Sequence, residues 1–288
     1  MNKDLTIVIP SYRSKKLVLY HLKNLKNKYK IIIIDNAHDK TLKKIIESKF
    51  KNTDVYLRKN IGFGNAINFA SKFVKTKFFF VMCPDTKIYK NTISNLLKVG
   101  KKIDKFGMVS PTHIKDKSNK INNFYIKKKQ LNGTSMFFNT KIFKKINGFD
   151  ENIFLYYEEN DFFTKCNHLD LELYLITNSF YNHIDSDNKN NLLETHSSTF
   201  NNLDEKNDSY YVGGWHGQWS KFYYHKKYNG YLNALFYCLP NILMNLVQLP
   251  AAILVNYTKA KYKYFKIEGF VCSAIGLPSF KRSKFDKN

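Results

Sequence analysis

The sequence predicts an α/β fold in which a mainly parallel, doubly wound sheet is flanked by helices. Short apolar runs rich in β-branched residues, such as 5–9 and 31–34, are continuous and do not alternate with polar residues. Continuous runs are typical of strands buried on both faces. The segments between them, such as 15–25 and 41–50, carry apolar residues at helical spacing, so each helix connects two parallel strands.

The same alternation defines the later elements. We expect further strands at 55–57, 77–82, 108–112, 123–126 and 171–176, and helices at 63–74 and 91–102. The stretch 131–161 predicts a glycine-marked turn, a short strand, a helix and a tight turn at Gly148–Asp150. A further helix then opens with Glu158, Glu159, Asn160 and Asp161.

Composition divides the chain into three parts. Residues 1–184 form the α/β domain, and residues 185–209 are polar and aperiodic, as expected of a loop or linker. Residues 210–288 begin with an aromatic and basic helix at 213–228. From Tyr228 to Thr258 the chain then has no charged residue or histidine, and only Pro240 and Pro250 break an apolar run.

This apolar run predicts helices that associate with a membrane. If it is helical, its polar side chains fall within an arc of ~120°. They are Asn233, Asn241, Asn245 and Gln248. Three alternatives remain open: a helix pair lying in the membrane plane, a true span, or a helix packed on the α/β domain.

The charge pattern favours an anionic membrane surface or an anionic sugar nucleotide over nucleic acid as a partner. The formal net charge is +24, but the only arginines are Arg13, Arg58 and Arg282. Arginine is the residue that forks onto phosphates and guanine edges. Four separated cysteines indicate reduced, buried thiols, and the short apolar start indicates no export signal. We therefore expect a cytoplasmic protein, peripheral at the inner face of the cell membrane.

Polar residues follow four of the predicted strands. In a doubly wound sheet, ligands bind at the carboxyl ends of the strands, so these residues should converge on one edge. They are Pro10-Ser11-Tyr12, Asp35-Asn36, Arg58-Lys59-Asn60 and Asp85-Thr86. The topology alone therefore makes a nucleotide site plausible at this edge.

The segment Asn60–Asn68, NIGFGNAIN, resembles the N-x-G-[FY]-[GA]-x-[AG]-x-N signature of the rhamnosyltransferase-like branch of glycosyltransferase family 2. Further blocks similar to that family occur in family order: IVIPSYRS, IIIIDNAHDK, MCPDT, LNGTSMFF and INGFDENIFLYYEENDFFTK, followed by a histidine after the next strand. The resemblance covers roughly residues 5–230. It implies that residues 1–184 form a GT-A catalytic domain, which is a Rossmann-like α/β fold with a mixed, mainly parallel sheet.

The resemblance also implies which residues bind the nucleotide-sugar donor. Those matching the donor-binding positions are Pro10, Tyr12, Asp35, Arg58, Asn60, Gly62, Asn68 and Asp85. Gly62 and Gly64 would let backbone approach the donor closely. Structural roles compete at two positions, because Pro10 also suits the end of a strand and Asp35 the start of a helix.

A divalent metal, Mg²⁺ or Mn²⁺, is expected from the same resemblance. Asp85 occupies the position of the metal-binding carboxylate, and Cys83 stands where the family usually has Asn or Asp. His183 is the expected second ligand, with His196 a weaker rival. Such a hard cation prefers oxygen ligands and would also use the phosphates of the donor.

Glu159 aligns with the catalytic base of the family, Glu158 with the preceding acidic residue, and Asp161 with a supporting position. Neighbouring carboxylates disfavour joint ionisation, which would raise one pKa toward the range useful for a base. Either glutamate could be the base, because Glu replaces the usual Asp. Alternatively, these acidic residues have no catalytic role, because the helix dipole favours negative charge in the first turn of any helix.

The sequence thus predicts an inverting glycosyltransferase. Its donor would be dTDP-rhamnose or a UDP- or dTDP-sugar, and its acceptor a polyprenyl-linked or other glycan in surface polysaccharide or lipopolysaccharide assembly. One alternative is a sugar-phosphate nucleotidyltransferase, although VIPSYRSKK lacks the glycine that its phosphate loop would need. Another is a non-catalytic basic adaptor at a membrane or nucleic acid.

Overall fold

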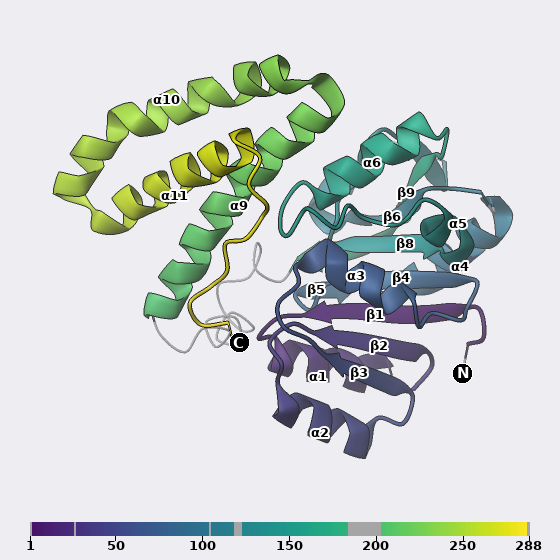
Figure 1. The fold of residues 1–288 in the computed structure, drawn as a ribbon. Helices are drawn as coiled ribbons and strands as arrows, with labels where there is room; N and C mark the ends of the chain where they lie inside the picture. The colour runs from purple at the N-terminus through teal and green to yellow at the C-terminus, as the bar shows by residue number, and fades with distance from the viewer. Residues whose placement is uncertain (1, 26, 104, 118–122, 184–202, 287–288) are drawn as a thin grey trace. The chain divides into compact units, whose positions relative to one another are not determined.

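The protein is described here by a computed structural model covering residues 2–25, 27–103, 105–117, 123–183 and 203–286 (Figure 1). It divides into two compact units. The first comprises residues 1–61, 66–149 and 162–199, and the second comprises 62–65, 150–161 and 200–288. His196 and most of the expected linker lie outside the described residues.

A nine-stranded sheet forms the centre of the first unit, with strand order β3-β2-β1-β4-β8-β6-β9-β5 and β7 paired to β9. Strands β1 to β4 are parallel, β8 runs antiparallel beside β4, and β6 and β9 are parallel. The strands are β1 Leu5–Ser11, β2 Lys30–Asp35, β3 Thr53–Leu57, β4 Phe78–Met82, β5 Thr86–Ile88, β6 Met108–His113, β7 Tyr125–Lys128, β8 Ser135–Asn139 and β9 Leu173–His183. The mixed, mainly parallel sheet confirms the predicted fold class.

Helices and one short 3₁₀ turn connect the strands. They are α1 Lys15–Leu25, α2 Lys40–Lys49, α3 Phe63–Ser71, α4 Thr92–Ile103, η1 Ile114–Asp116, α5 Thr140–Lys145 and α6 Glu158–His168. The second unit contains three longer helices, α9 Leu203–Asn229, α10 Tyr231–Val255 and α11 Tyr257–Ala274. The C-terminal helical extension expected from the sequence is therefore present.

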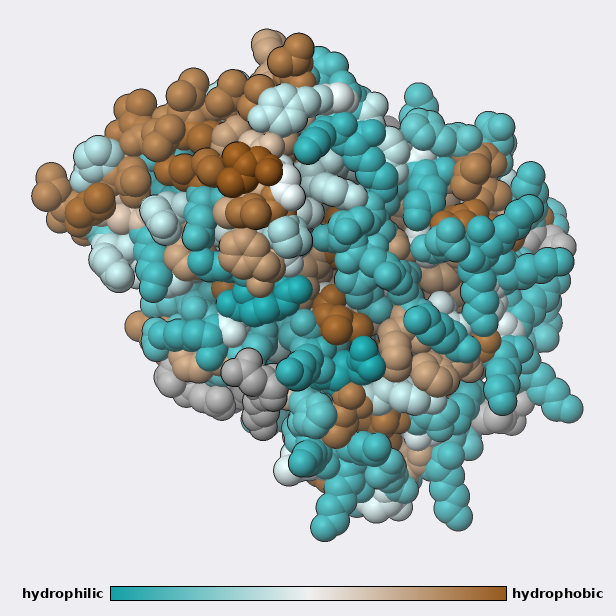
Figure 2. All heavy atoms as spheres, viewed as in Figure 1, coloured by the Kyte–Doolittle hydropathy of each residue, from teal (hydrophilic) through white to brown (hydrophobic). Residues whose placement is uncertain are grey.

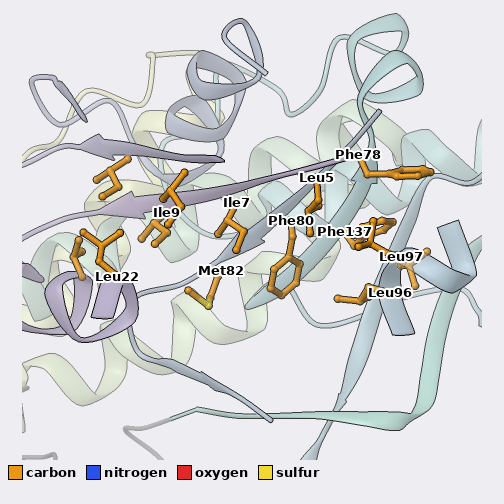
Figure 3. Close-up of a cluster of buried hydrophobic side chains, with 14 of the residues drawn as sticks. Leu5, Ile7, Ile9, Leu22, Phe78, Phe80, Met82, Leu96, Leu97 and Phe137 are labelled. Carbon is orange, nitrogen blue, oxygen red and sulfur yellow. The ribbon is translucent and has the colours of Figure 1, made fainter. Parts of the chain in front are cut away.

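Apolar side chains cover both faces of the sheet, as the continuous apolar runs predicted. On one face Leu5, Ile7 and Ile9 of β1 pack with side chains of α1, α2 and α4, including Leu22 and Leu96 (Figure 3). The opposite face is built from phenylalanine rings, namely Phe79, Phe138, Phe143, Phe149 and Phe162. Two covered faces are what fix a parallel sheet in place.

Several elements differ from the sequence prediction, and for three of them the physical reason is clear. β1 continues through Pro10 to Ser11, because β4 pairs with β1 only as far as Val8 and proline therefore loses no ladder bond on that side. β5 was not predicted, since three residues are too few for a periodic pattern. β9 extends past Ile176 to His183 across an irregularity in its pairing with β6.

The expected linker ends earlier than predicted. Residues 203–209 were included in the polar loop but form the first turns of α9. Asp204 and Glu205 lie in the first turn of this helix, where negative charge is favourable. The polar composition of this stretch therefore reflects a helix start as well as a connection.

Close helix contacts define the packing of the second unit. A Cβ atom added at Gly269 of α11 would lie 2.2 Å from the Trp215 carbonyl oxygen of α9, so glycine is needed at this crossing. Trp219 Nε1 donates to the Leu277 carbonyl at 2.9 Å, and Ser273 Oγ donates to the Trp219 carbonyl at 2.9 Å. The aromatic residues of α9 are thus mainly core residues.

The polar arc of α10 faces its neighbouring helices. Gln218 Nε2 of α9 lies 3.4 Å from Asn241 Oδ1, and Lys263 Nζ of α11 donates to Gln248 Oε1 at 2.6 Å. Asn245 Nδ2 donates to the Asn241 carbonyl at 2.6 Å. The spacing of these residues therefore marks the side of α10 that packs on protein.

We predict that Gly269→Ala lowers the stability of the second unit while Gly217→Ala does not. The nearest atom to a Cβ at Gly217 is 3.8 Å away, so alanine fits there and gains helix propensity of ~1 kcal/mol. At Gly269 the same gain is outweighed by overpacking, which typically costs ~1–3 kcal/mol. Urea unfolding followed by tryptophan fluorescence measures both variants. Equal midpoints would show that α9 and α11 do not cross closely at Gly269.

Candidate functional site

The carboxyl ends of the first three strands are level, as the sequence predicted. Ser11 of β1 pairs with Asp35 of β2, which pairs with Leu57 of β3. Backbone bonds continue this line, because Asn36 N–H donates to the Ser11 carbonyl at 2.8 Å and Arg58 N–H to the Asp35 carbonyl at 2.9 Å. Tyr12, Asn36 and Arg58 therefore start neighbouring loops at one edge of the sheet.

Asp35 is a buried carboxylate at the centre of this edge, 1% exposed. Its Oδ2 accepts a hydrogen bond from the Asp39 N–H at 2.6 Å. Burial raises the pKa of Asp35, and the hydrogen bonds to its oxygens partly oppose this shift. The alternative role considered for Asp35 was that of a helix N-cap. In the structure the N-cap is Asp39, whose side chain accepts from the Thr41 and Leu42 N–H groups.

Two of the predicted donor-binding residues, Arg58 and Tyr12, take part in contacts between an arginine and an aromatic ring. The guanidinium carbon of Arg58 is 4.4 Å from the centre of the Phe69 ring, and that of Arg13 is 5.2 Å from the centre of the Tyr12 ring. Stacking orients a guanidinium while leaving its N–H groups at the ring edge. Arg58 is exposed and follows β3 directly.

Asp85 lies in a turn that a buried histidine supports. His21 of α1 is 4% exposed, and its Nε2 is 2.7 Å from the Pro84 carbonyl oxygen. Burial lowers the pKa of His21, so its ring is neutral at pH 7 and Nε2 donates this hydrogen bond. His21 is a site residue that the sequence reasoning missed, because an isolated histidine in a helix carries no motif.

Strand pairing brings the two predicted metal ligands close along the backbone. Thr86, directly after Asp85, pairs with His183 of β9. Within the described residues there is no cluster of three or more His, Cys, Asp or Glu side chains suited to a metal. One carboxylate beside one histidine position fits a hard cation whose other ligands come from the phosphates of the donor.

The signature segment Asn60–Asn68 contributes residues to both units. Contacts within each unit hold these residues in place. Gly62 has φ of +90°, and a Cβ there would lie 2.1 Å from the Phe154 carbonyl oxygen. Asn68 Nδ2 donates to the Phe149 carbonyl and its Oδ1 accepts from the Phe149 N–H, both at 2.9 Å. The structure thus gives Asn68 a role in holding the Gly148–Phe149 turn, and donor binding by Asn68 remains a prediction.

The two glutamates at the start of α6 differ in exposure. Glu158 is 5% exposed, whereas Glu159 is partly exposed. Burial, followed by the negative charge of Glu159, raises the pKa of Glu158 to about 8, and burial also raises the pKa of Glu159. No described residue gives Glu158 Oε2 a hydrogen bond. A base must reach its substrate, so exposure favours Glu159 in that role.

The backbone before these glutamates is strained. Tyr156 and Tyr157 have φ of +64° and +67°, in the left-handed region that non-glycine residues rarely adopt. Each such residue costs about 1–3 kcal/mol, and strain of this kind often occurs at functional sites. The ring of Tyr156 lies over Gly213 of α9, with its hydroxyl 3.1 Å from where a Cβ would be. Glycine in α9 therefore leaves room for the strained turn.

Asp161, three residues after Glu158, is fully buried and bonded to Lys227 and Tyr228 of α9. The sequence placed Lys227 only within the aromatic and basic helix expected at 213–228. The complementary charges are 66 residues apart, and no periodicity connects them.

A cavity of about 560 Å³ lies among residues of α1, β5 and α4 in the first unit. Tyr20, His21 and Tyr29 line one part of it, and Lys87 and Tyr89 another. None of the site residues predicted from the sequence lines this cavity.

Comparison with known proteins identifies the family and the fold. The model of glycosyl transferase family 2 matches residues 6–166, which is more than half of the chain. A search among characterised protein sequences finds no match. The structure resembles the mannosyltransferase PcManGT from Pyrobaculum calidifontis in complex with GDP-Man and Mn²⁺, with TM-score 0.56, 11% identity, and coverage of 95% of this chain and 87% of that chain.

Two further solved structures share the fold. S. aureus TarS in complex with UDP-GlcNAc matches with TM-score 0.50 and 14% identity, covering 95% of this chain and 92% of the TarS chain. GalNAc-T7 with UDP, GalNAc and Mn²⁺ matches with TM-score 0.53 and 12% identity, covering 62% of this chain and only 43% of that one. Identities this low show the fold alone. Taken with the family match, they establish that this chain belongs to glycosyltransferase family 2 and has the GT-A fold.

Proposed function

We propose that this protein is an inverting, metal-dependent glycosyltransferase that moves a sugar from a nucleoside diphosphate to a hydroxyl of a lipid-linked glycan. The observation that carries the proposal is the Glu158–Glu159 pair at the start of α6, whose buried environment raises both pKa values in a chain of this family. A carboxylate with a raised pKa suits proton transfer near neutral pH.

The donor is proposed to bind at the level edge formed by β1, β2 and β3. Tyr12 supplies an aromatic platform, Asp35 a carboxylate for base or ribose, and Arg58 a cation for the diphosphate. The signature Asn60–Asn68 favours dTDP-rhamnose or a UDP- or dTDP-sugar, whereas the neighbours were crystallised with UDP-GlcNAc and with GDP-Man and Mn²⁺. Surface polysaccharide or lipopolysaccharide assembly is the proposed setting.

Asp85 and the residue at position 183 would hold the Mg²⁺ or Mn²⁺ ion together with the donor phosphates. When bound, this ion stabilises negative charge on the departing diphosphate. His21 keeps the Pro84–Asp85 turn in place through its bond to the Pro84 carbonyl. Cys83 contributes no hard oxygen ligand, so we expect weak metal affinity without donor.

Glu159 is proposed to take the proton from the acceptor hydroxyl as that oxygen attacks C1 of the sugar. The nucleoside diphosphate leaves from the opposite face, so the anomeric configuration inverts. Burial raises the pKa of both glutamates, and the negative charge of Glu159 raises that of Glu158 further, so Glu158 keeps its proton beside the base. Asp161 is structural in this scheme, because its bonds to Lys227 and Tyr228 occupy it.

We predict that Glu159→Gln lowers turnover by about 10²–10⁴-fold, the usual contribution of a general base, while donor affinity is unchanged. Turnover is read as nucleoside diphosphate released from a panel of TDP-, UDP- and GDP-sugars, and affinity by calorimetry. Glu151→Gln, an exposed position on the preceding loop, is the matched control. Turnover of Glu159→Gln within a few-fold of the wild type would remove Glu159 from the role.

Asp85→Ala should weaken binding of the metal and, with it, binding of the donor. We expect Mn²⁺ titration, followed by the loss of its free electron paramagnetic resonance signal, to show tight binding only when UDP or TDP is present. In Asp85→Ala this binding should weaken by at least about tenfold, which is ~1.4 kcal/mol. Asp54→Ala, which removes a partly exposed ion pair to Lys30, is the control. Equal Mn²⁺ binding in both variants would exclude Asp85 as a ligand.

The membrane is the proposed partner of α10. By length and composition it is the one helix in the described part of the chain that could span a membrane, and only 17% of its most apolar stretch is buried. Figure 2 shows hydrophobic surface gathered over this helix. The exposed large residues include Leu232, Phe236, Leu243, Val247 and Leu254. Such a surface is unfavourable in water and suits lipid.

An in-plane position fits this helix better than a lone span. One side of α10 packs through Ala234, Cys238 and Ile242, which are buried. The neighbouring α11 carries Lys259, Lys261, Lys263 and Lys266, which would be costly to place in hydrocarbon. These lysines instead favour anionic headgroups, in keeping with the net charge of +24.

We predict that Val247→Glu with Leu254→Glu releases the protein from vesicles. An apolar side chain that becomes buried in lipid contributes ~1.5–3 kcal/mol to binding. Loss of two such contributions should lower the bound fraction by about tenfold or more. Flotation with phosphatidylcholine vesicles, with and without phosphatidylglycerol, measures binding. Leu203→Glu, on α9 and equally exposed to solvent, is the control. Binding that is unaffected by the charges, or a vesicle-free dimer that they disrupt, would contradict the proposal.

A further inference from the structure

Lys227 of α9 lies between two buried aspartates of the same unit. Its Nζ is 2.7 Å from Asp150 Oδ2 and 2.5 Å from Asp161 Oδ1. The side chain of Asp150 is 10% exposed and that of Asp161 is 0% exposed, whereas Lys227 is 31% exposed. Loss of the cation that pairs with a buried carboxylate is strongly destabilising. The ammonium group is thus required by the two acids.

Two tyrosines of α9 complete this cluster. Tyr223 OH donates to Asp150 Oδ2 at 3.0 Å, and Tyr228 OH donates to Asp161 Oδ1 at 2.9 Å. Burial lowers the pKa of Lys227, but its bonds to Asp150 and Asp161 together outweigh burial, so its pKa is raised and the amine stays charged. The last turns of α9 therefore present one cation and two hydroxyl donors to this pair of acids.

Asp161 shares the first turn of α6 with the proposed base. Residues three apart on a helix are neighbours on its surface, so Asp161 lies beside Glu158. Its backbone N–H donates to the Tyr157 carbonyl at 2.9 Å, which joins it to the strained turn. Whatever holds Asp161 therefore also fixes the direction in which the Glu158–Glu159 pair points.

We propose that Lys227 is a positioning residue for the transfer reaction: by binding Asp161 and Asp150 it fixes the first turn of α6 and compensates the negative charge next to the Glu158–Glu159 pair. This inference rests on the proposed function of that pair. It assigns to α9 a part in catalysis separate from the membrane role of the helix that follows it.

A role as a basic flank for the membrane does not explain this geometry. Lys226, the neighbouring residue, has its Nζ 5.7 Å from the centre of the Tyr231 ring. The Lys227 ammonium instead turns toward two carboxylates. A flank that binds headgroups would leave its charge available to solvent.

The titratable groups around the pair decide how its pH dependence is read. They are Tyr156 and Tyr157 on the preceding loop, Asp161 on α6, and Tyr224, His225, Lys227 and Tyr228 on α9. Burial raises the pKa of Tyr156 and Tyr157 above 10, and burial lowers the pKa of His225 below 6.5. Between pH 6.5 and 9 Tyr156, Tyr157 and His225 therefore stay neutral, and changes in rate there report the glutamates.

The test compares Lys227→Met, Lys227→Arg and the double variant Lys227→Met with Asp161→Asn. We expect Lys227→Met to lower kcat by about 10–100-fold, as misplacement of a catalytic group does, with donor affinity within about twofold of the wild type. Lys227→Arg should recover most of the activity. Lys284→Met, which removes an exposed ion pair to Asp204, is the control and should have no effect. Soluble assays without vesicles exclude any effect of membrane binding.

The pH profile separates positioning from a merely structural role. The base acts when deprotonated, so the rate rises with pH through the pKa of the glutamate pair. Without the Lys227 cation, the uncompensated charge of Asp161 disfavours ionisation of the pair, and the rising limb should shift to higher pH. The double variant removes both charges, so its limb should return toward the wild type. A uniform loss of kcat at every pH, or no return in the double variant, would overturn the proposal.

A second measurement tests the proposal independently of the reaction. Hydrogen exchange of the backbone amides at 158–161 should become faster in Lys227→Met and stay at the wild-type rate in Lys284→Met. If the wild type transfers no sugar but exchange responds in this way, the function assigned to the pair fails while the fixing of α6 holds. Unchanged exchange at 158–161 in Lys227→Met would contradict the inference itself.

Discussion

The burial of carboxylates is the constraint on which the candidate site depends. An ionised carboxylate removed from water must find a cation or several donors, or it takes up a proton. Asp161 takes the first course with Lys227 and Tyr228, and Glu158 the second, as its raised pKa shows. One helical turn therefore holds a fixed anion and a group that gains or loses a proton near neutral pH. This difference, set by surroundings, is what makes the turn suitable for general base chemistry.

The donor edge depends on a different kind of order. The carboxyl ends of neighbouring parallel strands lie at the same edge of the sheet. Ser11, Asp35 and Leu57 are accordingly paired across three strands. Backbone pairing and a core on both faces hold this edge in place.

The sequence predicted the sheet and the level edge because both follow from local patterns. Continuous apolar runs define buried strands, and the polar residues that end them need no long-range information. Lys227, His21 and the strained Tyr156–Tyr157 turn could not be predicted in this way. Lys227 bonds to a residue 66 positions away, and His21 to one 63 positions away, so only the folded chain brings them together. Positive φ at two tyrosines is imposed by packing and contradicts their own preference.

The same distinction applies to α10. Its polar arc was visible in the sequence, but polarity alone did not show what the arc faces. In the structure Asn241 meets Gln218 and Gln248 meets Lys263, so protein satisfies the polar side and the apolar side is exposed. The polar face of α10 thus packs on protein and its apolar face is exposed, whereas a helix on the surface of a globular protein usually buries its apolar face. An exposed apolar face is unfavourable in water, and the adjoining lysines of α11 are suited to anionic groups. A membrane surface provides both an apolar environment and anionic groups, which is why lipid is the partner proposed for this helix.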